Sequence, residues 1–409
     1  MEVSSPVFVS AEAFSMKRVL ALAAIAYALV FAQAATLQPA DGKHIFRFDT
    51  FGDEQLWTDT LQMHQALAAV PPSLALKVGL KVDVEALPRS IVKALIAGQV
   101  NLDDPAVTAQ LLSLNAVVGV MGKVSPAGDI ESIGITCALC HSTVDNSLMT
   151  GVGRRLDGWP NRDLLVGEII LLSPVLTDTQ RQAFIGWPPG FYDPRIQAFD
   201  GTGFIPINPA PPSFPVVIPP AYGLRGVGFE TVTGDGPISY WNAYVGIGQM
   251  GGQGNFRDPR IPLTITQSPD LITSKLPALL RYQLSLAAPA PPAGSFSRAA
   301  ARRGEMLFNT VAKCSTCHIP PTYTDVNLGS APPLLHAPGE TGMEPVYASR
   351  SVTGLYRTSP LRGVWQHPPY FHDGSAPTLA DVVNHYDTVL KLGLTAAQKA
   401  DLVQFLKSL

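Results

Sequence analysis

The chain alternates between segments with helical periodicity and stretches that proline keeps irregular. Apolar residues recur three and four positions apart over residues 57–69, 88–97 and 108–118, which predicts three short amphipathic helices. Over residues 173–220 prolines remove backbone donors and prevent a helix from continuing. This stretch is therefore predicted to be an ordered loop that wraps a domain.

A second proline-rich segment, residues 287–294, divides the chain into two parts. It precedes a helical pattern through Arg303, Met306 and Leu307, and we expect a domain boundary there. The N-terminal domain is predicted to span residues 35–294, with an insertion at about 142–220. The C-terminal domain then spans residues 295–409.

Two helices of the C-terminal domain have readable starts. Thr378 with Asp381, and Thr395 with Gln398, have the spacing of capping boxes. Apolar residues follow each box at helical spacing, so each helix should bury one face. Strand signals are scarce along the whole chain, and the predicted fold class is mainly α.

The first 34 residues have the pattern of an export signal. Lys17 and Arg18 precede an apolar run over residues 19–31, and Ala32-Gln33-Ala34 is a small-x-small cleavage pattern. Met16 lies directly before Lys17 and is the expected true start. The apolar run is shorter than the about 20 residues of a spanning helix. We therefore expect a mature periplasmic protein without a membrane span, with an uncleaved anchor as the alternative.

The overall composition bounds the possible partners. With 409 residues and 46% hydrophobic content, the chain can bury the cores of two or three domains. Its net charge of −3 provides none of the basic surface that nucleic acid needs, so nucleic acid is not an expected partner.

All four cysteines lie in two Cys-x-x-Cys-His motifs, Cys137-Ala-Leu-Cys140-His141 and Cys314-Ser-Thr-Cys317-His318. In this spacing both thiols can bond to the vinyl groups of one haem while the adjacent imidazole reaches the iron. Structural zinc and disulfides are the alternatives. Neither explains why a histidine follows the second cysteine of both motifs. We predict two covalently bound haems c, with His141 and His318 as proximal ligands.

The segment from Thr358-Ser-Pro-Leu-Arg-Gly to Pro-Tyr-Phe-His372-Asp-Gly374 resembles the C-terminal domain of bacterial di-haem cytochrome c peroxidases and their MauG-like relatives. Gly304 and Phe308, ahead of Cys314, resemble the first helix of a cytochrome c. The resemblance covers residues 219–409 well and the remainder weakly. It implies two cytochrome c-like haem domains, with a long Pro/Gly-rich irregular insertion in the first.

The family supplies a distal ligand to the second haem from the helix after the His-Asp-Gly turn. Counted along this chain, the matching residue is Tyr386. His385, about 100° around the helix, and Met343 are the other candidates. Tyr386 as a core residue is the non-functional alternative. A tyrosinate ligand would stabilise ferric iron and disfavour a plain electron carrier.

The family also places a tryptophan between its two haems, and Trp241 matches that position. The glutamate that serves the peroxidases as acid and base is missing before Pro259. Asp258 is the candidate substitute, and Gln249 and Gln253 are candidates to hold a distal water or bound oxygen.

Two arginines in the insertion, Arg154 and Arg155, are candidates to bind haem propionates, because guanidinium groups pair well with carboxylates. A solvated turn with surface ion pairs is the alternative. No histidine occurs from residue 142 to residue 306. The first iron is therefore expected to be open on its distal side or capped from the N-terminal segment, for instance by His64.

These observations favour a periplasmic di-haem oxidoreductase, in which the first haem reacts with peroxide or oxygen and the second relays electrons through Trp241. A small cytochrome or cupredoxin is the expected redox partner. A non-catalytic electron-transfer cytochrome and a haem oxygenase that cleaves a hydrophobic substrate are the alternatives.

Overall fold

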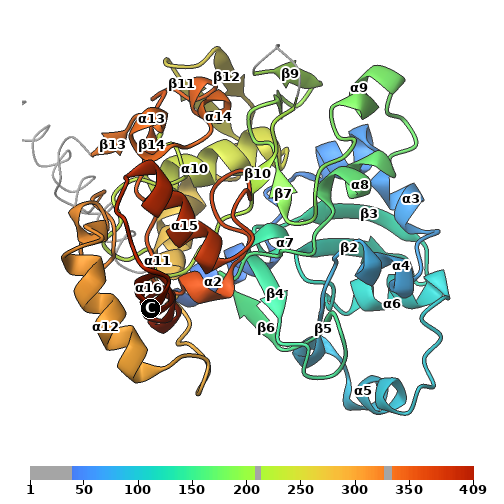
Figure 1. The fold of residues 1–409 in the computed structure, drawn as a ribbon. Helices are drawn as coiled ribbons and strands as arrows, with labels where there is room; N and C mark the ends of the chain where they lie inside the picture. Colours follow the sequence, from blue (N-terminus) through green and yellow to red (C-terminus); the bar gives the residue numbers. More distant parts are fainter. Residues whose placement is uncertain (1–38, 208–212, 327–333) are drawn as a thin grey trace, which may run out of the picture.

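The computed structural model describes residues 39–207, 213–326 and 334–409 (Figure 1). The predicted export signal lies outside these residues. No helix within them is long and apolar enough to cross a membrane.

The described chain is mainly helical. Its α-helices are α2 (Pro39–Phe48), α3 (Met63–Leu67), α4 (Pro72–Lys77), α5 (Arg89–Ile96), α6 (Pro105–Ser113), α7 (Ala138–His141), α8 (Val166–Leu171), α9 (Asp178–Gln182), α10 (Ile238–Tyr244), α11 (Leu276–Ser285), α12 (Arg298–Asn309), α13 (Pro338–Thr341), α14 (Pro345–Ser349), α15 (Leu379–Val389) and α16 (Ala396–Ser408). The three longest of them, α12, α15 and α16, lie in the C-terminal part.

Strands are more numerous than the sequence suggested, but each sheet in the described residues has two short strands. β1 (Val82–Asp83) and β5 (Val152–Gly153) are parallel. The antiparallel pairs are β2 (Val120–Val124) with β3 (Ile130–Ile135), β4 (Ser142–Val144) with β6 (Arg155–Asp157), β7 (Phe191–Tyr192) with β10 (Val216–Val217), β8 (Gln197–Phe199) with β9 (Phe204–Pro206), β11 (Asn255–Asp258) with β12 (Leu263–Thr266), and β13 (Leu335–His336) with β14 (Tyr356–Arg357).

Helix predictions in the N-terminal part are confirmed in part. The segment 88–97 forms α5. The predicted helix over 57–69 is interrupted, because Gln62 adopts a left-handed conformation between a π-helical turn, Gln55–Thr60, and α3. The helix predicted over 108–118 ends at Ser113, and Asn115 has a φ of 52° before the chain enters β2. The prediction of a loop over 173–220 is wrong for part of the stretch, because its described residues form α9 and the strands β7, β8, β9 and β10.

The two predicted capping boxes are confirmed. Thr378 and Asp381 cap α15, and Thr395 and Gln398 cap α16. Helix α16 crosses α12 at close range, because a Cβ atom on Gly304 would overlap the backbone of Asp401. These helices share a hydrophobic core whose members all come from residues 308–409.

The C-terminal helices also pack on the rest of the chain. Tyr222 donates a hydrogen bond to the carbonyl of Gly363 at 2.9 Å, and Arg162 donates one to the carbonyl of His367 at 2.9 Å. In Figure 1, α15 lies in front of α10 and α11, between α12 and the strands β7 and β10. The predicted division into two haem domains stays a prediction.

Candidate functional site

The first Cys-x-x-Cys-His motif forms α7 and the residue before it. Ala138 and Leu139 are buried against the core, whereas Cys137, Cys140 and His141 keep accessible surface. Cys137 packs against the same core cluster as Ala138, and Cys140 against the same cluster as Leu139, so this short turn joins two cores and keeps both thiols and the imidazole partly accessible. This is the donor set that covalent haem attachment requires.

The imidazole of His141 is oriented by the backbone. Its Nδ1 lies 3.1 Å from the carbonyl oxygen of Pro219. Burial lowers the pKa of His141 to about 4, so the ring is neutral at pH 7. A neutral ring whose Nδ1 donates to a carbonyl has its Nε2 lone pair free for iron.

The second motif has the same arrangement. Cys314 opens a 3₁₀ turn, Cys314–Thr316, and Nδ1 of His318 lies 2.9 Å from the carbonyl oxygen of Tyr323. Burial lowers the pKa of His318 as well. The two proximal candidates are therefore equivalent in their backbone anchoring, and both fit a haem ligand.

The four cysteines are free thiols in the structure, with no disulfide among them. Burial raises the pKa of Cys137 and Cys140 to about 12, which keeps both protonated at neutral pH. One group of possible metal ligands exists in the described residues: Cys317, Asp325 and His336, whose ligand atoms lie within 4.8 Å of one another. A thioether bond to haem would remove the thiolate from that group.

Tyr386 lies on α15 and faces the second motif. Burial, followed by the nearby thiols of Cys314 and Cys317, raises the pKa of Tyr386 to about 12. The neighbouring His385 is turned elsewhere, with Nε2 2.8 Å from the carbonyl oxygen of Thr341. Tyr386 is thus the better placed of these two candidates.

Met343, the third distal candidate, packs against a separate cluster. That cluster contains Tyr347, Ala348 and Tyr356, next to the strand residue Val216. Met343 therefore packs where Val216, from the N-terminal part of the chain, meets residues of the C-terminal part.

Trp241 lies on α10 and is buried, with an exposed fraction of 8%. The guanidinium of Arg195 lies 5.6 Å from its ring centre. Its indole Nε1 is buried without a hydrogen-bond partner. A cavity of about 180 Å³ beside Trp241 is lined also by Arg195, Arg260 and Arg350. Each guanidinium already pairs with a carboxylate of the chain: Arg195 with Asp235, Arg260 with Asp258 and Arg350 with Asp193. The unpaired indole N–H of Trp241 is the donor that would suit a carboxylate such as a haem propionate.

Gln249 is held on both sides of its amide. The hydroxyl of Tyr192 donates to its Oε1 at 2.6 Å, and its Nε2 donates to the carbonyl of Gln197 at 2.9 Å. Tyr192 lies close enough to Cys140 for the thiol to affect its pKa, although burial is the main reason that this pKa is raised. The pair Tyr192–Gln249 therefore lies near the first motif.

Asp258 and Gln253 have other surroundings. Asp258 pairs with Arg260 and accepts a hydrogen bond from the hydroxyl of Tyr240 at 2.7 Å. The hydrogen bonds from Arg260 lower the pKa of Asp258 to about 2, so the carboxylate holds no proton at neutral pH. The backbone of Gln253 donates to the carbonyl of Phe51 and accepts from Leu271, at 2.8 and 2.9 Å.

The two insertion arginines differ. Arg154 is exposed and pairs with Asp145 at 2.9 Å, as expected if it belongs to a solvated turn with surface ion pairs. Arg155 is buried, and its Nε pairs with a carboxylate oxygen of Asp83 at 3.1 Å, whereas its Nη1 has no hydrogen-bond partner. Of the two, Arg155 keeps a donor atom for a propionate. His64 lies on α3, and its Nδ1 is also buried without a hydrogen-bond partner.

Sequence reasoning did not single out Tyr192 or Arg195. Both lie in the proline-rich stretch, in the run Phe191-Tyr-Asp-Pro-Arg195, which has no motif that marks chemistry. Their partners are 57 and 46 positions away, at Gln249 and Trp241, so local spacing carries no signal of either pairing.

Comparisons with known proteins point to haem c. Residues 354–388 match the family described as RoxA-like, cytochrome c-like. A cytochrome-c peroxidase, IdrP1 of Denitromonas iodatirespirans, is 30% identical over a segment that covers 27% of this chain and 40% of that protein. The chain thus matches less than half the length of this curated relative.

Two solved structures are similar over about half of the chain. Hydrazine synthase of Kuenenia stuttgartiensis, pressurised with xenon, matches with 21% identity and a TM-score of 0.33, covering 50% of this chain and 75% of that chain. A MauG-like protein associated with microbial copper homeostasis matches with 19% identity and a TM-score of 0.35, covering 54% and 85%.

Proposed function

We propose, on the premise that this chain is a relative of the di-haem cytochrome c peroxidases and MauG-like proteins, that it is a periplasmic oxidoreductase with two covalent haems. Its reactive centre is at His141 and its electron relay at His318. When bound, haem c supplies one-electron and oxygen chemistry. The substrate in this proposal is peroxide or oxygen, and the electrons come from a small cytochrome or cupredoxin.

The observation that carries this proposal is the inequality of the two motifs. The second faces Tyr386, a phenol close to both of its cysteines. The first has the hydrogen-bonded pair Tyr192–Gln249 near Cys140 instead. The phenol of Tyr386 is available as a second protein ligand to the haem iron, which favours a six-coordinate relay at the second motif. The phenol of Tyr192 is already hydrogen-bonded to the amide of Gln249, which favours a site at the first motif that holds a small oxygen ligand.

The residues of the first site have distinct parts in the proposal. His141 would hold the iron through its Nε2, because its Nδ1 is anchored to the carbonyl of Pro219. Tyr192 holds the side chain of Gln249 so that the amide can orient bound water or peroxide. Asp258 stays ionised in its pair with Arg260, and this disfavours it as the proton donor in place of the family's glutamate.

Trp241 supports a route between the two sites. It lies on α10, and Arg195 lies between its ring and that of Tyr347 in the C-terminal part, 5.6 and 5.2 Å from the ring centres. In this proposal, electrons pass from one haem to the other by way of Trp241.

The ionised Asp258 is also what favours the second candidate, a non-catalytic electron-transfer cytochrome. Electron paramagnetic resonance of the oxidised, haem-loaded protein distinguishes the two. We expect one high-spin ferric signal from the first haem and one low-spin signal from the second. Two low-spin signals would support the carrier, and a pyridine haemochrome assay showing fewer than two covalent haems would reject both.

A further inference from the structure

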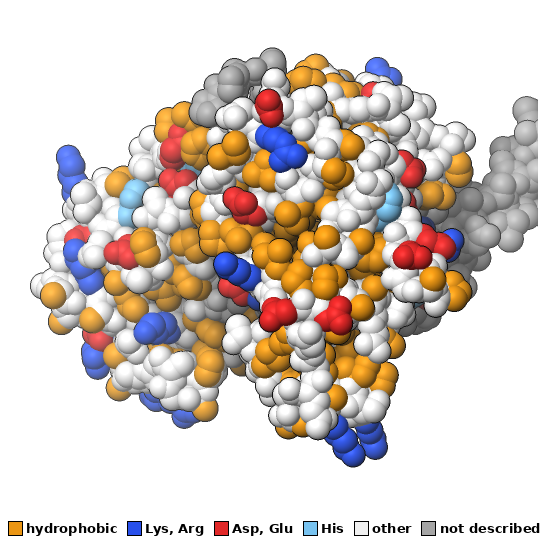
Figure 2. Space-filling model, turned by 90° about the vertical axis from the view of Figure 1, so that its right-hand side faces the viewer, with side chains coloured by type: hydrophobic (Ala, Val, Ile, Leu, Met, Phe, Trp, Pro, Cys, Tyr) orange, Lys and Arg blue, Asp and Glu red, His pale blue; other side chains and the backbone are white. Residues whose placement is uncertain are grey.

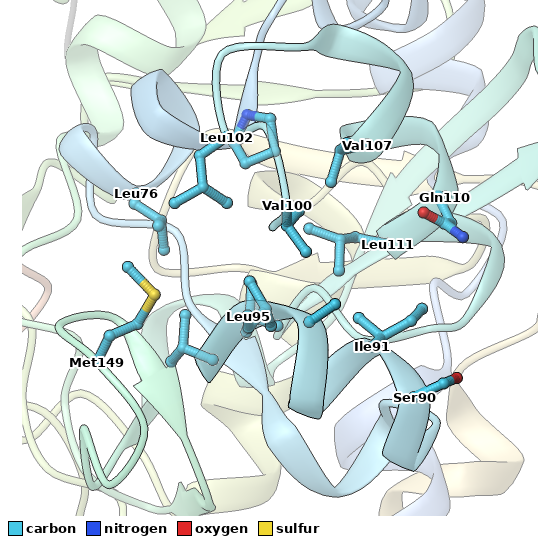
Figure 3. A pocket seen from close by; sticks show the side chains of 14 residues that line it. Leu76, Ser90, Ile91, Leu95, Val100, Leu102, Val107, Gln110, Leu111 and Met149 are labelled. Atoms are coloured by element: carbon cyan, nitrogen blue, oxygen red, sulfur yellow. The ribbon is translucent and has the colours of Figure 1, made fainter. Parts of the chain in front are cut away.

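A large apolar cavity lies beneath α5, in the N-terminal part of the chain. Its volume is about 290 Å³. Ile91 and Leu95 of α5 form one wall, and Val107 and Leu111 of α6 form the opposite wall (Figure 3). Among the described residues that line it, none is charged.

Helix α5 contacts the core through Ile91, Val92 and Leu95, and it roofs this cavity. It is amphipathic, yet none of its residues is buried. Protein interiors are normally packed as tightly as organic crystals, and a dry cavity of roughly 150 Å³ already binds benzene in an engineered protein. The cavity under α5 has room for a molecule about twice that size.

The polar groups of the lining are confined to one end. Ser90 and Gln110, the two polar residues of the lining, are both exposed and lie at the same side of the cavity, whereas Leu76 and Met149 lie at the opposite side (Figure 3). Figure 2 shows the face of the molecule that carries α4, α5 and α6, on which apolar side chains gather over broad areas between scattered charges. The opening is thus polar and the interior apolar.

The cavity continues inward as a smaller one of about 70 Å³, which shares Leu76, Val82 and Leu111 with it and is bounded by Leu139 of the first Cys-x-x-Cys-His motif. A molecule bound under α5 would therefore be separated from Leu139 of α7 by this smaller cavity.

We propose that the cavity under α5 binds a small neutral molecule of about ten non-hydrogen atoms, with a hydrocarbon body and one hydroxyl or carbonyl group. The body contacts Ile91, Leu95 and Leu111, and the polar group bonds to Gln110 or Ser90. A charged ligand should bind more weakly, because the lining contains no charged residue that could pair with an ionised group. The proposal does not depend on the haem chemistry above.

The test uses the full, haem-loaded protein with 1-octanol as probe and octanoate as its charged counterpart, in isothermal titration calorimetry and thermal unfolding. We expect saturable one-to-one binding of octanol with a rise in the melting temperature, and binding of octanoate at least tenfold weaker. Absence of saturable octanol binding, or equal binding of both probes, would overturn the proposal.

Variants locate the site. Ala94→Phe places a ring inside the cavity and should abolish octanol binding, whereas Ala97→Phe adds the same ring to an exposed position just after α5 and should not. Gln110→Leu should weaken octanol binding about fivefold, as the loss of one hydrogen bond implies. Equal binding by both phenylalanine variants would place octanol elsewhere. If Ala94→Phe does not fold, Ala94→Leu replaces it with the same expected direction.

Discussion

The guanidinium of Arg195 lies between two aromatic rings, 5.6 Å from the centre of Trp241 and 5.2 Å from that of Tyr347. The same guanidinium pairs with the buried carboxylate of Asp235. One cation thus joins α10 to α14, and so the middle of the chain to its C-terminal part.

Replacement of Arg195 by Met should destabilise the protein by about 3–5 kcal/mol, because it leaves the Asp235 carboxylate buried without its cation. Urea unfolding at pH 7 measures the change. Arg154→Met is the matched control, since Arg154 is exposed and its surface pair contributes little. Equal midpoints for both variants would contradict the role of Arg195.

Replacement of Tyr386 by Phe should change the absorption and paramagnetic resonance spectra of one haem, because it removes the oxygen that faces Cys314 and Cys317. His385→Asn, one position earlier on α15, should leave both spectra as they are, since its ring is bonded to Thr341. A spectrum of Tyr386→Phe that matches the wild type would return Tyr386 to a packing role.

Asp258 should stabilise the fold in a pH-dependent way. Hydrogen bonds from Arg260 lower its pKa from 3.8 to about 2 in the folded protein. A depressed folded-state pKa means that the contribution is complete above about pH 4 and is lost as the pH falls through 2.

Asp258→Asn should therefore lose about 2 kcal/mol at pH 7, a typical value for a hydrogen bond to a charged group. Its acid dependence between pH 4 and 2 should be flatter than that of the wild type in urea unfolding. Asp59→Asn, at an exposed position, is the control. An unchanged acid limb in Asp258→Asn would show that the pair with Arg260 does not hold in solution.

Gly304→Ala should separate α12 from α16, because the added Cβ would overlap the carbonyl oxygen of Asp401. Forcing extra atoms into a packed contact typically costs about 1–3 kcal/mol of folding stability, and we expect a loss in that range for Gly304→Ala. Gly339→Ala adds the same methyl group where no atom lies within 4 Å. Thermal unfolding of the two variants should differ, and equal midpoints would mean that the helices can shift without cost.

Several parts of this protein could be predicted from local sequence. The haem attachment motifs, the capping boxes of α15 and α16, and helix α5 all depend on residues within a few positions of one another. The position of Tyr386 on α15 could be predicted, because Tyr386 follows the residue that caps this helix, Thr378, within the same helix. Over such short distances, helical geometry alone decides which side chains share a face.

The ends of two predicted helices could not be read from the spacing of apolar residues. Gln62 and Asn115, with left-handed backbones, ended helices that their apolar spacing predicted to continue. The spacing of apolar residues reports which face is buried, but it does not report a single backbone reversal within the segment.

By itself the sequence predicted a haem c protein, from two Cys-x-x-Cys-His motifs and a segment that resembles the cytochrome c peroxidase and MauG-like family. Only the tertiary structure decided that Tyr192 meets Gln249, that Arg195 lies over Trp241, and that the ionised Asp258 pairs with Arg260. The physical reason is that covalent attachment needs donors adjacent in the chain, whereas the polarity around a site comes from side chains that the fold brings together.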